Sequence, residues 1–268
     1  IEDQEVVYFV AGGGGSGSSS VITFLNILMK QSNRILLVVA TPFIKESIPA
    51  TSNATRLLNR VSEFSNNMSV YVASADDISK NLGSHAFEKI NERIVENTRT
   101  ITDLPDFHSD NHYTPFAIDE GDHQSVAYSG GFINLSYDNP EVYEGRELKI
   151  RNPKFSYGKV QEASNILVTK LVHTRHNQET TTLEGDKLVE VAMRISGSAK
   201  SARALYGIVR NSDRNMPDYI TLASGLSVDK IFEKLKDKAT DSALRHMEKS
   251  KTRASKKLER KEDKLLDV

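Results

Sequence analysis

The stretch Val6–Ser20, VVYFVAGGGGSGSSS, decides how the chain is interpreted, because an apolar run ends in four glycines and then serines. Gly/Ser runs are often flexible linkers, yet a linker rarely joins a buried strand directly to a helix. Val6–Val10 has the continuous apolar pattern of a central strand that is buried on both faces. Ser18–Gln31 has a helical period, with three serines at its start as candidate N-caps. A glycine loop between a strand and a helix presents free N–H groups to an anion, so the stretch predicts a phosphate site.

The common nucleotide-binding motifs are incomplete in this loop. The Walker pattern is absent because no Gly-Lys-Ser/Thr follows the glycines, and the dinucleotide fingerprint fits only loosely. A Rossmann-type oxidoreductase would carry an acidic ribose ligand at the end of the second strand, where Ala40, Thr41 and Pro42 stand instead. The residues therefore favour a phosphate-binding loop of another kind.

The composition fits a folded protein with a core of ordinary size. The chain has 268 residues, 38 % of them hydrophobic, a formal net charge of -1 and no cysteine. Disulfides and cysteine metal sites are excluded, and the lack of cysteine fits a reducing compartment. Apolar runs fall short of the roughly 18–20 residues that cross a bilayer, so no membrane span is predicted. The chain opens on Ile1 rather than on methionine, and we expect an upstream segment.

Strands and helices are predicted to alternate after the loop. Arg34–Ala40 and Ser69–Ala73 have the pattern of strands, and Thr51–Asn67 and Ser84–Ile101 that of helices with one apolar face. This β-α-β-α-β order calls for a parallel sheet covered by helices.

A second α/β unit is predicted after a polar segment that is broken by Pro105 and Pro115. Strand-like patterns occur in GGFINLSYD, Leu188–Ile195 and Tyr219–Ser224, helical ones in Gly158–His173 and Ser198–Leu205, and Val228–Lys264 is predicted to be a long charged helix.

The glycine loop resembles the tubulin signature Gly-Gly-Gly-Thr-Gly-Ser/Thr-Gly. The matching residues are Gly13, Gly14, Gly15, Ser16, Gly17 and Ser18, with Ser16 in place of threonine and Ser19 where the last glycine is usual. Later segments resemble the tubulin/FtsZ superfamily in the same order. VVATPFIKES resembles the ribose-side loop, HAFEKINERI the start of the central helix, IDEGDHQSVAYSGGFINLSYD the synergy loop with the next strand, and SARALYGIVRNSDRNMPDYITLASGLS the last strands. The charged C-terminal helix is more similar to TubZ, the tubulin of plasmids and phages.

The resemblance implies a GTP/GDP site. The glycine loop would bind the phosphates, Glu46 would contact the ribose, and Phe87 with Asn91 would hold the guanine. Four residues apart on a helix, Phe87 and Asn91 share a face, so a ring can cover the base while an amide pairs with its edge. Without the resemblance, the same two residues would be an ordinary core phenylalanine and a solvated asparagine.

The resemblance also implies a catalytic loop that acts on the nucleotide of the neighbouring subunit. Asp119 and Asp122 match its Asp-x-x-Asp spacing, and such acids position the water that attacks the γ-phosphate. Mg²⁺ on the β- and γ-phosphate oxygens would compensate charge. The family's Asn before the first acid is Ala117 or Ile118 here, a departure that bears on the turnover rate. By composition alone the segment is a polar turn, and a rival acidic set consists of Asp103, Asp106 and Asp110.

These features predict a tubulin/FtsZ-like α/β fold. A parallel nucleotide-binding sheet, which lacks the family's first strands, is joined by a long central helix to a second α/β domain and then a long C-terminal helix. The expected boundaries are 1–83 for a partial GTP-binding domain, 84–118 for the central helix and connecting loop, 119–227 for the C-terminal GTPase-activating domain, and 228–268 for the C-terminal helix and tail.

The expected function is that of a filament-forming cytoskeletal GTPase of the TubZ type, in the cytoplasm of a bacterial cell, which segregates or positions plasmid or phage DNA. A non-hydrolysing tubulin-like scaffold is the alternative, followed by a Rossmann-type oxidoreductase.

The expected partners are further copies of the chain, in a head-to-tail filament, and a DNA-bound adaptor protein on the C-terminal helix. Residues 245–264 have more Lys and Arg than acids, which suits an acidic surface, but no interleaved aromatics for base stacking. Direct nucleic-acid binding is therefore not expected. No protein metal site is expected either, since His173 and His176 have no acidic third ligand.

Overall fold

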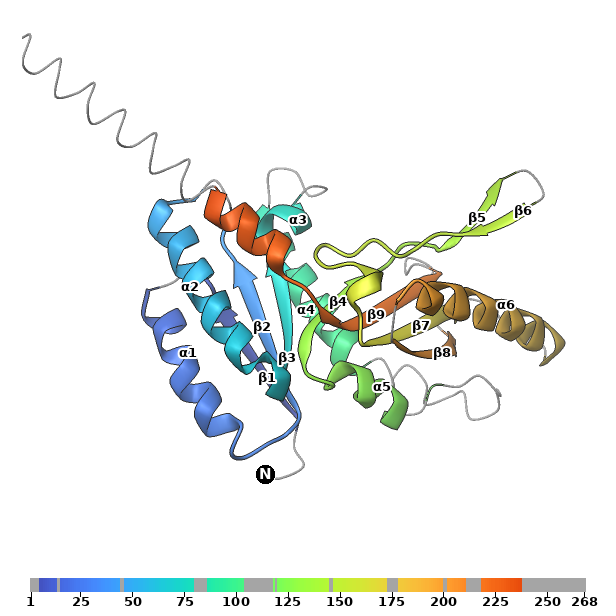
Figure 1. Cartoon of the computed structure of the whole chain (residues 1–268), viewed down its shortest axis with the longest axis horizontal. Helices are drawn as coiled ribbons and strands as arrows, with labels where there is room; N and C mark the ends of the chain where they lie inside the picture. Colours follow the sequence, from blue (N-terminus) through green and yellow to red (C-terminus); the bar gives the residue numbers. More distant parts are fainter. Residues whose placement is uncertain are drawn as a thin grey trace, which may run out of the picture.

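The structure is a computed structural model that describes residues 5–13, 15–43, 46–79, 86–103, 118, 120–144, 147–172, 178–199, 202–210 and 218–237. Its main feature is one seven-stranded sheet with the order β1-β2-β3-β4-β9-β7-β8, beside a separate pair, β5–β6 (Figure 1). The strands are β1 (Val6–Ala11), β2 (Ile35–Thr41), β3 (Ser69–Ser74), β4 (Gly131–Ser136), β5 (Glu141–Glu144), β6 (Glu147–Ile150), β7 (Asn165–Val172), β8 (Arg203–Arg210) and β9 (Tyr219–Leu226). The α-helices are α1 (Gly15–Leu28), α2 (Ile48–Phe64), α3 (Ala75–Ser79), α4 (Ala86–Asp103), α5 (Glu120–Ala127) and α6 (Gln178–Gly197), and the short 3-10 helices are η1 (Ser65–Asn67) and η3 (Val160–Glu162).

Helices cover both faces of the sheet and bury two apolar clusters. One cluster holds the inner faces of α1, α2 and α6, and the other holds those of α4 and α5. β1, β2, β3 and β4 run parallel, whereas β9 is antiparallel to both β4 and β7. The predicted parallel β-α-β-α-β arrangement of the first half is thus confirmed.

Helix α2 shows how local sequence determines where a helix begins and which face it buries. The Ser47 hydroxyl accepts a hydrogen bond from the Ala50 N–H at 3.4 Å, and Pro49 lies in the first turn, where no N–H is needed. The helix buries a row of small and branched residues against α1 and the sheet: Ala54, Leu57, Leu58 and Val61. It begins three residues earlier than its apolar period predicts, because the cap and the proline, not the apolar row, determine the first turn.

Two predictions about the glycine region are wrong. Strand β1 lies at an end of the described sheet instead of at its centre, and Phe9 keeps 51 % of its surface exposed. An apolar run indicates apolar neighbours on both faces, but it carries no information on whether both edges are paired. Helix α1 begins at Gly15, so Ser18, Ser19 and Ser20 lie inside the helix and are not N-caps. The last residues of the glycine loop already have helical backbone.

Three assignments in the second half are also wrong. The predicted helix Gly158–His173 contains strand β7, the predicted strand Leu188–Ile195 lies within α6, and the predicted helix Ser198–Leu205 runs into β8. In the part of α6 whose side chains are described, the fully buried apolar side chains are Leu188, Val191, Ala192 and Ile195, which is the spacing of a helix face. Strand β7 lies between β9 and β8, and a strand buried in this way has no alternation that distinguishes it from a helix.

The two halves are joined by α4, as predicted, and also by direct strand pairing. Strand β3 pairs with β4 over three residue pairs only, from Ser69 opposite Gly131 to Tyr71 opposite Ile133. Directly beyond them, the buried Tyr157 hydroxyl accepts a hydrogen bond from the Val72 N–H at 3.1 Å and donates one to the Ile133 carbonyl. A single side chain therefore bridges β3 and β4 where their pairing stops.

The chain returns to the first half after β9. Residues 229–237 are helical, and Ile231 and Leu235 are buried in the cluster that contains α2. Nζ of Lys234 lies 3.8 Å from Oδ2 of Asp77. The remainder of the predicted C-terminal helix lies outside the described residues. Within the described ranges, no helix combines the length and apolar character that would span a bilayer.

Candidate functional site

A cavity of about 230 Å³ lies at the carboxyl ends of β1 and β2, beside α4. It is lined by Ala11, Gly13, Ala40, Thr41, Pro42, Phe43, Glu46, Ala75, Phe87, Ile90, Asn91 and Ile94. In open α/β sheets, this edge is where ligands bind. Four residues that the sequence analysis assigned to one site, Gly13, Glu46, Phe87 and Asn91, meet in this cavity.

The glycine loop packs closely on the end of β2. The Gly12 N–H donates to the Ala40 carbonyl at 2.7 Å, and a Cβ on Gly12 would lie 3.1 Å from that oxygen. A Cβ on Gly13 would lie 3.2 Å from Cβ of Pro42 and 3.3 Å from Cβ of Ala50. Side chains at these two positions would push the loop away from the sheet. The backbone of the loop is therefore itself a wall of the cavity.

The loop leads directly into α1. Gly14 lies outside the described residues, and the backbone of the next residues, Gly15–Ser18, forms the first turn of the helix. The first N–H groups of a helix have no partners within it and carry partial positive charge. An anion in the cavity would thus meet both a glycine backbone and a helix N-terminus.

The loop after β2 forms a second wall. Oε1 of Glu46 accepts a hydrogen bond from the Phe43 N–H at 3.0 Å, directly before the Ser47 cap. Glu46, assigned to the ribose by sequence, therefore lines the cavity and is also tied to Phe43, another lining residue.

An aromatic pair stands at the mouth of the cavity. The rings of Phe43 and Phe87 meet edge to face, with centroids 5.2 Å apart and planes at 88°, and Phe87 is 69 % exposed. Such a pair offers an apolar wall to a flat ring. Phe43 is not among the residues predicted for the site, although an aromatic three residues before Glu46 in the same loop is a usable signal.

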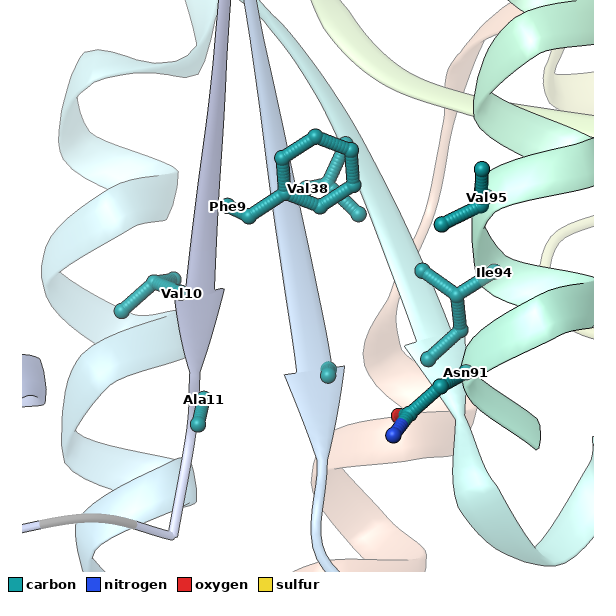
Figure 2. A pocket seen from close by; sticks show the side chains of 8 residues that line it. Phe9, Val10, Ala11, Val38, Asn91, Ile94 and Val95 are labelled. Carbon is teal, nitrogen blue, oxygen red and sulfur yellow. The ribbon is translucent and has the colours of Figure 1, made fainter. Parts of the chain in front are cut away.

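Asn91 also lines a second cavity, of about 260 Å³, which lies between α4 and the strands β1 and β2. Figure 2 shows its amide reaching from α4 toward the strands, with Ile94 and Val95 on the same helix and Phe9 and Val38 on the strands opposite. Asn91 is exposed, so its donor and its acceptor are both accessible to a ligand.

A buried hydrogen-bond network fixes helix α4 to the sheet. Nδ2 of Asn97 donates to the Tyr71 hydroxyl of β3 at 2.7 Å, and Oδ1 of Asn97 accepts from the Tyr137 hydroxyl at 2.9 Å. Burial raises the pKa of Tyr71 and of Tyr137, so both hydroxyls keep their protons. The network joins α4 to β3 and to the residue after β4. It therefore fixes the position of α4, and with it that of Asn91, relative to the sheet and the cavity.

Asp122, one of the two predicted catalytic acids, lies at the other end of the sheet. Asp122 is in the first turn of α5, which directly precedes β4, and β4 runs parallel to β3. Helix α5 therefore lies where β1, β2 and β3 begin, whereas the cavity lies where they end (Figure 1). Oδ1 of Asp122 is 3.4 Å from Nη2 of Arg203, at the start of β8. Asp119 lies outside the described residues.

Asp103, the one described member of the rival acidic set, does not approach the cavity either. Asp103 ends α4 at the far end from Asn91 and forms an ion pair with Arg99 at 3.5 Å. Asp106 and Asp110 lie outside the described residues. Among the residues that the structure describes, no three acidic or histidine side chains gather as a metal site.

Comparisons with known proteins identify the fold. No family model and no curated protein matches the sequence. TubZ from Bacillus thuringiensis serovar israelensis, in a GTPγS-form protofilament, matches with a TM-score of 0.68 and 15 % identity over 95 % of this chain and 68 % of that chain. CetZ from Methanosaeta thermophila matches with a TM-score of 0.59 and 17 % identity over 99 % and 72 %. The FtsZ dimer of M. jannaschii matches with a TM-score of 0.57 and 17 % identity over 82 % and 63 %.

The chain has the tubulin/FtsZ fold. The expectation drawn from the glycine loop and the order of later motifs is confirmed at this level, with TubZ among the similar structures. At 15–17 % identity the likeness shows the fold, and the chemistry depends on the residues of the site.

Proposed function

We propose that the chain binds GTP and assembles head to tail into filaments, in which each GTP is hydrolysed between two subunits. The observation that carries the proposal is that the cavity and Asp122 lie at opposite ends of one sheet. A single subunit cannot bring the two together, but two subunits stacked in the same direction can. Such a heterologous contact leaves both ends of the assembly open, as a filament requires. The TubZ structure with the same fold is named as a protofilament in a GTPγS form.

The cavity suits a guanine nucleotide. The loop at Gly13 and the start of α1 would bind the phosphates, the Phe43–Phe87 wall would cover the base, and the Asn91 amide would pair with its edge. Glu46 lies within the same lining and would contact the ribose. Glu46 is the one acidic side chain in the described lining. A Mg²⁺ ion in this cavity would therefore be held mainly by phosphate oxygens and water.

Hydrolysis would need little covalent chemistry from the protein. Asp122, together with Asp119, would accept hydrogen bonds from the water that attacks the γ-phosphate of the neighbour's nucleotide. Positioning of that water and compensation of charge supply most of the rate in phosphoryl transfer, and a bound Mg²⁺ would supply part of the compensation. In this arrangement hydrolysis depends on assembly, so filaments would lose their stabilising GTP after they form.

A cellular role follows from the TubZ resemblance. We assign the filament to the movement or positioning of plasmid or phage DNA in the bacterial cytoplasm, through an adaptor on the basic C-terminal residues. A non-hydrolysing scaffold is the second candidate, because the family's Asn before the first acid is missing at Ala117 and Ile118. An oxidoreductase is disfavoured, because Ala40, Thr41 and Pro42 line the cavity where an acidic ribose ligand would stand.

The test of the proposal is GTP-dependent light scattering with phosphate release in the presence of Mg²⁺. Wild-type protein is expected to form polymer that turns over. The double variant Asp119→Ala, Asp122→Ala is expected to form polymer that persists, with phosphate release lowered about 100-fold, because the attacking water loses its acceptors. Asp186→Ala with Asp229→Ala removes two exposed acids elsewhere and is expected to behave as wild type. Absence of GTP-dependent scattering would overturn the filament, and undiminished phosphate release in the double variant would overturn the catalytic acids.

Guanine recognition by Asn91 gives a second prediction. Asn91→Ala is expected to weaken GTP binding about 10- to 100-fold, because hydrogen bonds to the base edge are lost. The measurement is calorimetric titration with GTP and with inosine triphosphate, which lacks the exocyclic amino group of guanine. Wild type is expected to prefer GTP, and the variant is expected to lose that preference. Glu92→Ala, at the next exposed position of α4, is the control. An unchanged GTP preference in Asn91→Ala would remove Asn91 from base recognition.

A further inference from the structure

Arg203 and Asp122 lie side by side although 81 residues separate them in the sequence. Helix α5, which carries Asp122, packs on β9 and β7, and Arg203 begins β8, the strand paired with β7. Nη2 of Arg203 is 3.4 Å from Oδ1 of Asp122. The packing of the second half thus brings a cation to the acid that the sequence assigned to catalysis.

The pair is not explained by folding stability. The two side chains are 60 % and 41 % exposed, and an ion pair in such a setting stabilises a protein little. The backbone of Arg203 is nevertheless held firmly, because its N–H donates to the Ser164 carbonyl at 3.1 Å and the strand pairs with β7 from this residue onward. The guanidinium therefore projects from a fixed point at the end of the sheet that carries Asp122.

We infer that Arg203 is a positioning residue of the composite site, which holds the Asp122 carboxylate in the orientation that the neighbour's nucleotide requires. The inference rests on the proposed function. An exposed carboxylate samples several rotamers, and a guanidinium donor restricts them before the neighbour arrives. The same cation offsets the repulsion between Asp122 and the phosphates of the incoming subunit, which a purely acidic face would have to overcome.

The test measures turnover per polymerised subunit at saturating GTP, together with GTP affinity and thermal unfolding of the free subunit. Arg203→Gln is expected to lower turnover about 10-fold with unchanged affinity and unfolding temperature, since Arg203 lies at the end away from the subunit's own cavity. Arg203→Lys is expected to restore part of the loss, because it keeps the charge without the planar donor set. Arg194→Gln is the matched control, because Arg194 forms an exposed ion pair with Glu190 on α6, at 2.9 Å.

A double-variant comparison separates positioning from a merely structural role. Because Arg203 is argued to act through Asp122, Arg203→Gln is expected to cause no further loss in the Asp122→Ala background, where residual turnover depends on Asp119. An equal loss in both backgrounds, or full turnover in Arg203→Gln alone, would overturn the inference and leave the proposed function standing. If wild-type protein forms no GTP-dependent polymer, the proposed function and this inference fail together.

Discussion

Replacing Tyr157 by phenylalanine is expected to lower the free energy of unfolding by about 2–4 kcal/mol, because two buried backbone groups then lose their partner. The Val72 N–H and the Ile133 carbonyl both bind the Tyr157 hydroxyl, and the side chain is 1 % exposed. Phenylalanine would keep the ring in place but leave this donor and this acceptor unpaired between β3 and β4. The measurement is urea denaturation followed by circular dichroism, with no nucleotide present.

Tyr206→Phe is the control for this substitution. Tyr206 lies on β8 and is 38 % exposed, so loss of its hydroxyl is expected to change the free energy of unfolding by less than about 0.5 kcal/mol. If Tyr157→Phe costs no more than the control, the hydroxyl does not hold the junction, and the two halves are kept together by α4, the core and the three β3–β4 residue pairs.

Placing a carboxylate in the glycine loop is expected to have the largest effect on binding. Gly13→Asp should weaken GTP binding at least about 100-fold, since a negative charge some 5 Å from a phosphate costs about 3 kcal/mol at an effective dielectric constant near 20. The new Cβ would also lie 3.2 Å from Cβ of Pro42 and 3.3 Å from Cβ of Ala50. Affinity is measured by titration with a fluorescent GTP analogue, relative to the folded fraction seen by circular dichroism.

Two further variants separate charge from crowding. Gly13→Ala adds the Cβ alone and is expected to lose a smaller part of the affinity than Gly13→Asp. Gly197→Asp makes the same substitution at the end of α6, where an added Cβ meets nothing within 4 Å, and is expected to bind as wild type. Wild-type affinity in Gly13→Asp would mean that the loop does not bind phosphate.

Much of the first half could be predicted from sequence because its signals are local. Strands β2 and β3 are short apolar runs between helices whose buried residues recur with a helical period. The second half has fewer such local signals. β7 has an apolar run without alternation, and α6 has a buried helix face that was mistaken for a strand. Those errors arise because β7 lies between two strands, a fact of long-range pairing that no window of sequence contains.

The residue types of the candidate site could likewise be predicted from local sequence, but the contacts between them could not. By itself, the sequence determined a glycine loop between a strand and a helix, an aromatic and an amide on one helix face, and a fold that comparison with TubZ bears out. Only the tertiary structure decided that Phe43 meets Phe87, that Tyr157 bridges β3 and β4, and that Arg203 reaches Asp122. Local patterns report which face of a segment must be buried, whereas the segment that covers it is chosen by the packing of the whole chain.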